Sequence, residues 1–296
     1  MSNKKFTLML LIPMILSSTL TAFAENFSDV KTGNKYFVSV NYLKEFGFVT
    51  GYEDNSFKPS QNVVRAEALK MIMGASSVIP AAVTTDTTTI FTDVPQDAWY
   101  KNYLAEALNL GIINNENTNF RPGDVINLAE SLKMYFNTLG DIDYQANGDT
   151  TFEDTPNDAW FKAYTSYAGA KGLINIYNNN TINPNQDMTR GYLAEIIYRQ
   201  IKTREGYNFG KATYYFGIPG KANDSYDQSL MVTAHKTLPM GTIVEVTNMS
   251  TGKSINVKVT DRGPFGPGRV LDLSNNAFSA LGDLSAGVMT VQYKVL

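Results

Sequence analysis

The sequence predicts two folded parts in one chain: an α-helical domain built from three repeats, followed by a small all-β barrel. Two observations predict this division. Over roughly the first 200 residues, helical segments that end in glycine recur three times, whereas beyond Tyr207 apolar and polar residues alternate as they do in strands. The length of 296 residues, 43% of them hydrophobic, suits about two domains of about 100 to 200 residues each.

Residues 1–24 form a predicted export signal. Lys4 and Lys5 precede a short apolar run, and the small residues Ala22 and Ala24 mark the expected cleavage site. The run is shorter than the roughly 20 apolar residues of a typical membrane span, so an uncleaved anchor is the weaker alternative. We therefore expect cleavage after Ala24 and an exported protein of the cell wall, the cell surface or a periplasm.

Composition narrows the chemistry that the chain can perform. It contains no cysteine and one histidine, which excludes disulfide bridges, cysteine-ligated zinc, thiol nucleophiles and a lipid anchor on an N-terminal cysteine. We expect no metal and no cofactor. The formal net charge is -3, and no basic run follows the first few residues, so the sequence predicts no nucleic-acid partner.

Three repeats, assigned to residues 25–80, 90–140 and 151–203, share a common layout. Each opens with a phenylalanine that is followed twenty residues later by a glycine. The phenylalanines are Phe27, Phe91 and Phe152, and the glycines are Gly47, Gly111 and Gly172. Because glycine commonly ends a helix, each repeat is predicted to contain a first helix that stops at this position.

Each repeat is also predicted to contain a second helix. The expected first helices cover 38–46, 98–110 and 159–171, and Asp97 and Asp158 are the N-cap candidates of the last two. A loop with an apolar-x-Pro element follows each glycine. The second helices then begin near Arg65, Leu128 and Arg190.

The loop and the start of the second helix in repeat one carry a recognisable pattern. Residues 51–59 read Gly-Tyr-Glu-Asp-Asn-Ser-Phe-Lys-Pro, and residues 64–67 read Val-Arg-Ala-Glu. Over roughly residues 27–200 the chain resembles the S-layer homology family, whose pattern ends in Thr-Arg-Ala-Glu. The resemblance implies a pseudo-threefold bundle whose grooves bind wall polymers, notably pyruvylated secondary cell-wall polysaccharide or glycan associated with peptidoglycan.

By this resemblance Arg65 and Arg190 contribute to the grooves, since a guanidinium pairs with a carboxylate through two hydrogen bonds. The alternative is that both arginines only brace the bundle. Repeat two has Asn127 where we place the arginine, and repeat one lacks the tryptophan that the others supply as Trp99 and Trp160. We expect fewer than three competent grooves, and we expect both tryptophans in the core.

The C-terminal part, 207–296, is predicted to be a small closed barrel. Apolar residues occupy every second position in 242–247 and 254–260, which indicates a hairpin, and 287–295 is a further strand. A short helix over 274–281 begins at a serine cap and ends at a glycine. Because few residues must join many strands, closing the sheet avoids exposed edges.

Five separated blocks in this part resemble the double-psi β-barrel of rare lipoprotein A. They are Ala-Thr-Tyr-Tyr at 212–215, Thr-Ala-His-Lys-Thr-Leu-Pro-Met-Gly-Thr at 233–242, Val-Thr-Asn at 246–248, Thr-Asp-Arg-Gly-Pro-Phe at 260–265 and Arg-Val-Leu-Asp-Leu-Ser at 269–274. The resemblance covers roughly residues 209–296. It implies a lytic transglycosylase that cuts the glycan strands of peptidoglycan, and it extends to expansins and family 45 glycosidases.

Lytic cleavage needs a carboxylic acid that protonates the glycosidic oxygen and a base that accepts the proton of the sugar's C6 hydroxyl. Asp261 is the candidate for both roles, because it ends a predicted strand just before a Gly-Pro turn. His235 is expected to orient Asp261 or to bind the sugar. The family's second carboxylate is a glutamate, for which Asp224 stands in within an altered, shorter block at 223–225. In the alternative interpretation, Asp261 and Arg262 form a turn and a surface ion pair.

Tyr214, Tyr215 and Arg262 are the candidate glycan contacts of the barrel, although tyrosines on a strand are as often packing residues. Asp272 is expected to be a hydrogen-bonding brace. The sequence thus predicts a wall-anchored protein whose barrel cleaves peptidoglycan glycan strands. Two alternatives stay open: a non-catalytic, expansin-like peptidoglycan-binding module, favoured by the altered block at 223–225, and a structural surface-layer component.

Overall fold

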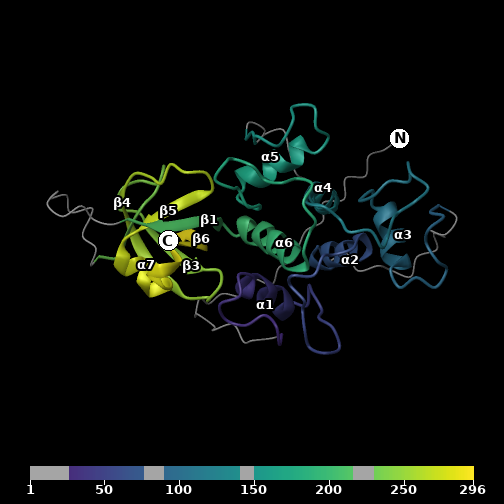
Figure 1. Cartoon of the computed structure of the whole chain (residues 1–296), viewed down its shortest axis with the longest axis horizontal. Coiled ribbons are helices and arrows are strands. Elements are labelled where there is room, and N and C mark those ends of the chain that lie inside the picture. Colours follow the sequence, from purple (N-terminus) through teal and green to yellow (C-terminus); the bar gives the residue numbers. More distant parts are fainter. Residues whose placement is uncertain (1–26, 77–89, 141–149, 216–229) are drawn as a thin grey trace.

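The computed structural model describes residues 27–76, 90–140, 150–215 and 230–296. A bundle of helices makes up the N-terminal part, and a closed barrel forms one end of the molecule (Figure 1). The predicted export signal lies outside the described residues, and so does Asp224. None of the helices in the described ranges is long and apolar enough to cross a membrane.

Each repeat contributes one pair of helices to the bundle. The pairs are α1 (Phe37–Glu45) and α2 (Arg65–Ala75), α3 (Lys101–Asn109) and α4 (Leu128–Leu139), and α5 (Lys162–Ala170) and α6 (Arg190–Arg204). Helix α2 packs against α3, α4 and α6, and α6 also packs against α1. The second helices therefore form the middle of the bundle, as the position of α2 and α6 in Figure 1 shows.

A ring of three backbone hydrogen bonds confirms the pseudo-threefold arrangement. Val63 N–H donates to the carbonyl of Met188 (2.8 Å), Met188 N–H to that of Ile126 (2.9 Å), and Ile126 N–H to that of Val63 (3.1 Å). These residues stand two positions before the first residue of α2, α6 and α4, and all three are fully buried. Each repeat thus contacts both others through the same position.

The helix ends agree only partly with the sequence prediction. Gly47, Gly111 and Gly172 follow the first helices with φ values of 72°, 70° and 66°, the left-handed conformation that glycine adopts without strain. The N-cap predictions for Asp97 and Asp158 are wrong. Helices α3 and α5 begin later, because a separate turn precedes each of them, with Lys101 N–H donating to the carbonyl of Ala98 (3.0 Å) in repeat two.

The aspartate that opens each repeat holds the apolar-x-Pro loop. The Asp93 carboxylate accepts hydrogen bonds from the backbone N–H groups of Phe120 (2.9 Å) and Arg121 (2.7 Å). Arg121 has a φ of 60°, which is unfavourable for a residue with a side chain. Asp29 and Asp154 make the same pair of bonds in their own repeats. The two motifs therefore form one loop-stabilising unit.

The barrel is closed, with its strands in the order β1-β5-β2-β4-β3-β6. The strands are β1 (Asn208–Tyr214), β2 (Val232–Ala234), β3 (Ile243–Asn248), β4 (Ser254–Asp261), β5 (Arg269–Leu273) and β6 (Val288–Val295). The pairs β1–β5 and β2–β4 are parallel, and the other pairs are antiparallel. The antiparallel pair β3–β4, joined by a short turn, is the predicted hairpin. Helix α7 (Asn275–Leu281) and the 3-10 turn η4 (Leu284–Ala286) precede β6.

Bundle and barrel share a packed interface. Met249, in the turn between β3 and β4, is fully buried within the hydrophobic core of the bundle, and its carbonyl accepts a hydrogen bond from Val38 N–H (3.2 Å). The buried Tyr198 hydroxyl of α6 donates to Gln292 Oε1 of β6 (2.7 Å). Since α6 leads into β1 within a few residues, the barrel is held against the third repeat.

Candidate functional site

Two carboxyl groups lie on either side of the short strand β2 in the barrel. Ala234 of β2 is in register with Asp261 of β4 on one side and with Asp272 of β5 on the other. Neighbouring strands are about 4.8 Å apart, which puts the two aspartate backbones about 10 Å apart. The register shifts between Thr233 and Ala234, and such irregularities commonly redirect side chains beside functional sites.

Asp272 is half-buried and accepts a hydrogen bond from the hydroxyl of Thr213 (2.9 Å). Burial raises the pKa of the Asp272 carboxyl, against the opposing effects of the Thr213 hydrogen bond and the Arg269 charge, and the charge of Asp261 raises it further. Asp272 thus keeps its proton to a higher pH than an ordinary aspartate does. The sequence pattern predicts Asp272 only as a brace, because its place beside Asp261 depends on a crossover of strands.

Asp261 lies at the end of β4, half-buried at the barrel surface. Its Oδ1 accepts a hydrogen bond from the backbone N–H of Arg262 (2.7 Å). Phe265, four residues further on, is 81% exposed and offers an aromatic face next to this turn. An exposed aromatic ring suits a sugar ligand, whose apolar face stacks on such rings, and this ring is four residues along the chain from Asp261.

The guanidinium of Arg262 does not pair with Asp261 among the contacts of the described residues. It donates instead to the carbonyl oxygens of Leu238 (2.8 Å) and His235 (3.3 Å). Arg262 therefore ties the end of β4 to the loop that follows β2. The alternative interpretation, a surface ion pair between Arg262 and Asp261, has no supporting contact among the described residues.

His235 is buried and holds the same loop from inside. Its Nδ1 accepts hydrogen bonds from the backbone N–H groups of Thr237 (3.1 Å) and Leu238 (2.9 Å), so the proton of the neutral ring sits on Nε2, within 2.9 Å of the Tyr293 hydroxyl. Burial, together with the charges of Arg262 and Lys236, lowers the pKa of His235. Both ring nitrogens of His235 are thus engaged, and its link to Asp261 is the backbone bond from His235 N–H to the Asp261 carbonyl (3.1 Å).

The two tyrosines of β1 occupy different places. The Tyr214 ring packs against Phe278 of α7 at 4.8 Å between centroids, and its hydroxyl donates to the Leu284 carbonyl (3.2 Å). Tyr214 therefore has a packing contact and stays partly exposed. Tyr215 continues the β1–β5 ladder, its N–H donating to the carbonyl of Leu273, which places it at the strand end beside Asp272.

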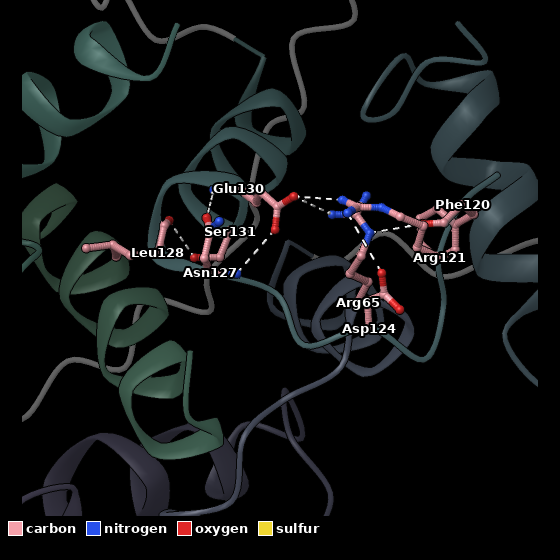
Figure 2. A network of polar contacts seen from close by, with 8 residues as sticks. All are labelled: Arg65, Phe120, Arg121, Asp124, Asn127, Leu128, Glu130 and Ser131. Carbon is pink, nitrogen blue, oxygen red and sulfur yellow. Dashed lines mark hydrogen bonds and ion pairs between the residues drawn. The ribbon is translucent and has the colours of Figure 1, made fainter. Parts of the chain in front are cut away.

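Arg65 of repeat one lines a groove formed with the loop of repeat two. Figure 2 shows its polar contacts with Phe120 and Glu130. Its Nε donates to the carbonyl of Phe120 (2.9 Å), and its NH1 lies 3.5 Å from Glu130 Oε1, which also binds Arg121 (2.8 Å). The groove encloses about 440 Å³ and also includes Lys133 and Trp160. Arg65 thus braces two repeats and lines the groove at once.

Arg190 of repeat three repeats this geometry at repeat one. Its Nε donates to the carbonyl of Phe57 (3.0 Å), and its NH1 lies 3.9 Å from Glu67. A cavity of about 250 Å³ lies beside it, lined also by Lys70 and Trp99. The Arg190 side chain is 7% exposed and that of Arg65 is 15% exposed, so less of Arg190 is open to a ligand.

The tryptophans are not core residues, contrary to the sequence prediction. Trp99 and Trp160 are both 54% exposed, and each lines one of the two grooves. The Nζ atoms of Lys70 and Lys133 lie 5.5 and 5.4 Å from the centres of these indole rings. Neither lysine was predicted from the sequence, although each stands five residues after the first residue of its second helix.

The third groove position of the bundle, between α4 and α6, lacks the arginine and the lysine that the other two grooves have. Asn127 is not the counterpart of the arginines, as the sequence analysis assumed; it is the N-cap of α4, its side chain accepting a hydrogen bond from Glu130 N–H (2.9 Å). Leu128 holds the arginine position, and Glu195 of α6 stands where α2 and α4 carry a lysine. Among the described residues, no cluster of three or more histidine, aspartate or glutamate side chains could hold a metal ion.

These features define a class of protein: a pseudo-threefold bundle with cationic, aromatic grooves, joined to a double-psi β-barrel that presents two carboxyl groups. Family models agree with both parts. The S-layer homology domain matches residues 26–69, 90–130 and 151–191, and the lytic transglycolase family matches residues 208–293. The chain therefore consists of three S-layer homology repeats followed by a domain like that of rare lipoprotein A. Together they indicate a protein of the cell surface or cell wall.

Relatives of the barrel are named endolytic peptidoglycan transglycosylase RlpA. The protein from Vibrio cholerae is 42% identical over 104 residues, which are 33% of this chain and 40% of that protein. The protein from Campylobacter jejuni is 32% identical over 136 residues, 46% of each chain. The chain thus spans less than half the length of these relatives.

Two solved structures are also similar to this chain. An expansin of Clavibacter michiganensis has 28% identity and a TM-score of 0.24, over 30% of this chain and 50% of that one. The Streptomyces papain inhibitor has 29% identity and a TM-score of 0.25, over 30% of this chain and 94% of that one.

Proposed function

We propose that the barrel is a lytic transglycosylase that cleaves the glycan strands of peptidoglycan, with Asp261 as general acid and then base. The observation that carries this proposal is the pair Asp261 and Asp272 on either side of Ala234, with the exposed Phe265 four residues along the chain from Asp261. The relatives named endolytic peptidoglycan transglycosylases support the same chemistry.

In the proposed reaction Asp261, protonated, gives its proton to the oxygen that links two sugars, and the bond from that oxygen to C1 breaks. The resulting carboxylate then accepts the proton of the C6 hydroxyl on the same sugar. The C6 oxygen bonds to C1, which closes an anhydro ring without water. The acid is regenerated, so no cofactor is required.

Asp272 supplies the second carboxyl group of this site. Burial raises its pKa, so the Asp272 carboxyl, in contact with Thr213, keeps its proton to a higher pH than an ordinary aspartate does. When Asp261 is charged, a neutral neighbour avoids repulsion between two carboxylates. Asp224, which the sequence analysis suggested for the second carboxyl, lies outside the described residues. A competing assignment, with Asp272 as acid and Asp261 as base, is separated by the variants described below.

The repeats are proposed to hold the protein on a secondary cell-wall polysaccharide. Two grooves combine an arginine, a glutamate, a lysine and an exposed tryptophan, which suits a sugar that carries a carboxylate. Arg65→Lys keeps the charge but loses the planar fork, so it is expected to weaken binding of pyruvylated polysaccharide about three- to tenfold. A matched control is Lys44→Arg, on α1 away from both grooves.

Export with cleavage after Ala24 would bring both parts to the wall, where a repeat domain that is already bound raises the local concentration of substrate for the barrel. Each barrel contact with glycan can then be weak. This explains why the two modules share one chain and one interface.

The test uses the mature chain, residues 25–296, with glycan strands stripped of peptides. Mass spectrometry of the products is expected to show anhydro ends, and Asp261→Asn is expected to abolish them while the protein stays folded. Reducing ends without anhydro sugar would indicate hydrolysis instead. Intact strands that the wild type binds but does not cut would overturn the enzymatic proposal.

The altered block at 223–225 favours one second candidate, a non-catalytic module that binds peptidoglycan. Restoring a glutamate through Asp224→Glu separates the two functions. If the wild type only binds and Asp224→Glu gains anhydro products, the barrel is a binding module in which the shorter side chain of Asp224 does not support cleavage. If the wild type already cuts, the second candidate falls.

A further inference from the structure

Tyr293 of β6 joins opposite sides of the barrel. In the closed strand order, β6 is three strands away from β2 in either direction, so the two strands face each other across the barrel interior. The Tyr293 side chain belongs to the barrel core and is 7% exposed. Its hydroxyl lies 2.9 Å from Nε2 of His235, the residue that directly follows β2. The phenol therefore links β6 to the loop beside the carboxyl site.

The hydrogen bond between these two side chains has a defined direction. Nδ1 of His235 accepts from the backbone N–H groups of Thr237 and Leu238, which leaves the proton of the neutral ring on Nε2. Nε2–H therefore donates to the hydroxyl oxygen of Tyr293. Because the partners of both nitrogens together fix the tautomer and the orientation of an imidazole, Tyr293 determines how His235 is held. Burial raises the pKa of Tyr293 to about 12, so its hydroxyl is neutral at physiological pH.

Two routes of hydrogen bonds lead from His235 to Asp261. The direct route is the backbone bond from His235 N–H to the Asp261 carbonyl (3.1 Å). The second route passes through Leu238, whose N–H donates to the imidazole and whose carbonyl accepts from the guanidinium of Arg262 (2.8 Å). The backbone N–H of Arg262 then donates to Oδ1 of Asp261 (2.7 Å). The carboxyl group is thus held by a residue whose own place depends on the imidazole.

His235 and Tyr293 are the buried end of an otherwise exposed segment. Residues 236–241 are exposed apart from Leu238, which is partly buried, and Arg262 on the facing turn is exposed as well. Exposed segments with few buried contacts open locally more often than the core does. The buried pair therefore anchors the loop against which the end of β4 is fixed.

We propose that Tyr293 is a positioning residue of the carboxyl site: its hydroxyl holds the imidazole of His235, and through it the loop and Arg262, so that the Asp261 carboxyl keeps its productive position. This proposal rests on the proposed function, since Asp261 is the acid and base of that reaction. Small displacements of an acid from the bond that it protonates slow the chemical step strongly and affect substrate binding little. Tyr293 itself contacts none of the reacting atoms in this scheme.

The first test compares Tyr293→Phe, which keeps the ring and removes the hydroxyl, with the wild-type mature chain on peptide-free glycan strands. We expect kcat per folded molecule to fall about tenfold and KM to change less than about twofold. The matched control is Tyr135→Phe, which removes another buried hydroxyl, bonded to the Ile197 carbonyl in the bundle (3.4 Å), and should leave kcat unchanged. An unchanged kcat in Tyr293→Phe, or an equal loss in both variants, would overturn the proposal.

The second test asks whether Tyr293 acts through His235. Tyr293→Phe, His235→Asn and the double variant form a cycle for kcat/KM. If the hydroxyl works by holding the imidazole, the double variant loses no more activity than His235→Asn alone. Two losses that multiply would show that Tyr293 acts independently of His235, and the proposed route would be wrong.

The third test needs no activity, so it separates this proposal from the enzymatic one. Amide hydrogen exchange followed by NMR should be about tenfold faster at Thr237, Leu238 and Arg262 in Tyr293→Phe. It should be unchanged at Met249, whose N–H donates to the Thr290 carbonyl at the interface with the bundle (3.0 Å).

The two proposals can therefore fail separately. Faster exchange at Arg262 in a protein whose wild type forms no anhydro products would remove the enzymatic proposal, and Tyr293 would still hold Asp261 in place. Anhydro products from the wild type, together with unchanged exchange at all three amide groups in Tyr293→Phe, would remove the positioning role and leave the enzyme.

Discussion

Asp261 and Asp272 belong to strands that do not pair with each other, yet both lie in register with Ala234, because β2 runs between β4 and β5. Asp272 has a hydroxyl partner in Thr213 and a raised pKa, whereas Oδ1 of Asp261 accepts a hydrogen bond from the backbone N–H of Arg262. The two carboxyl groups therefore differ in environment, a common basis for a division of roles.

The first prediction concerns the relative importance of these two groups. Asp261→Asn should lower kcat/KM for glycan cleavage by about 10³-fold with glycan binding retained, because the general acid and base is lost. Asp272→Asn should lower kcat/KM about 10-fold, and its main effect should be a shift in the pH dependence of kcat/KM. The exposed Asp97→Asn is the control. A larger loss in Asp272→Asn than in Asp261→Asn would assign the acid to Asp272.

The second prediction concerns stability and pH at Asp272. Its folded pKa is raised above the ordinary value of 3.8, so the folded state binds more protons than the unfolded state between the two values. The charged carboxylate thus destabilises the fold at neutral pH, and this penalty disappears as the pH falls towards 3.8. Asp272→Asn should raise the Tm at pH 7, with a gain that shrinks as the pH is lowered. A Tm difference independent of pH would contradict this.

The third prediction uses the single histidine of the chain. Because burial lowers the folded pKa of His235 below 6.5, the unfolded state takes up a proton first, and stability is lost as the pH falls below 6.5. NMR titration of this one imidazole should report a pKa below 6.5. His235→Asn should cost about 1 to 2 kcal/mol at pH 7, chiefly from the lost contact with Tyr293, and should flatten this part of the stability profile.

The fourth prediction addresses the aspartate of the repeat motif. Asp93→Ala removes the acceptor of two backbone N–H groups and leaves Arg121 in its left-handed conformation without support. We expect a loss of about 2 to 3 kcal/mol in the free energy of unfolding, measured with urea. Asp97→Ala, four residues along in an exposed turn, should change it by less than about 0.5 kcal/mol.

The fifth prediction concerns the interface between bundle and barrel. Tyr198→Phe leaves Gln292, which is 7% exposed, without its hydroxyl partner. A loss of about 1 to 3 kcal/mol is expected. Because the two parts share a core around Met249, they should still unfold in one calorimetric transition. Two separate transitions in the wild type would show that the interface is weaker than its contacts indicate.

Local signals predicted most of the fold. Helix-ending glycines, the Ser274 cap of α7 and the alternation in β3 and β4 depend on neighbours in sequence, and the structure confirms each of them. The N-cap predictions failed because an extra turn, stabilised within residues 95–101, delays the start of α3. Such a turn competes with the helix for the same residues, and the sequence pattern does not separate the two.

The site depended on contacts that sequence spacing does not reveal. Trp99 is exposed because it lines the groove that Arg190 of another repeat also lines. Asp261 and Asp272 lie on either side of β2 only because of the strand order of the complete barrel. Asn127 was misaligned by one residue, since an asparagine cap and an arginine at the first helical position look alike until the helix start is known. Periodicity identifies a face, and tertiary contacts decide what that face meets.

The hydrogen-bonded ring of Val63, Met188 and Ile126 fixes the repeat number at three. A solenoid can gain or lose units because each one touches only its neighbours. Here the first repeat must find the last across more than a hundred residues, so a chain that lacks any one unit leaves unpaired buried amide groups in both survivors. Substitutions can therefore change individual grooves, as they have in the groove between α4 and α6. The bundle cannot be lengthened by one repeat at a time.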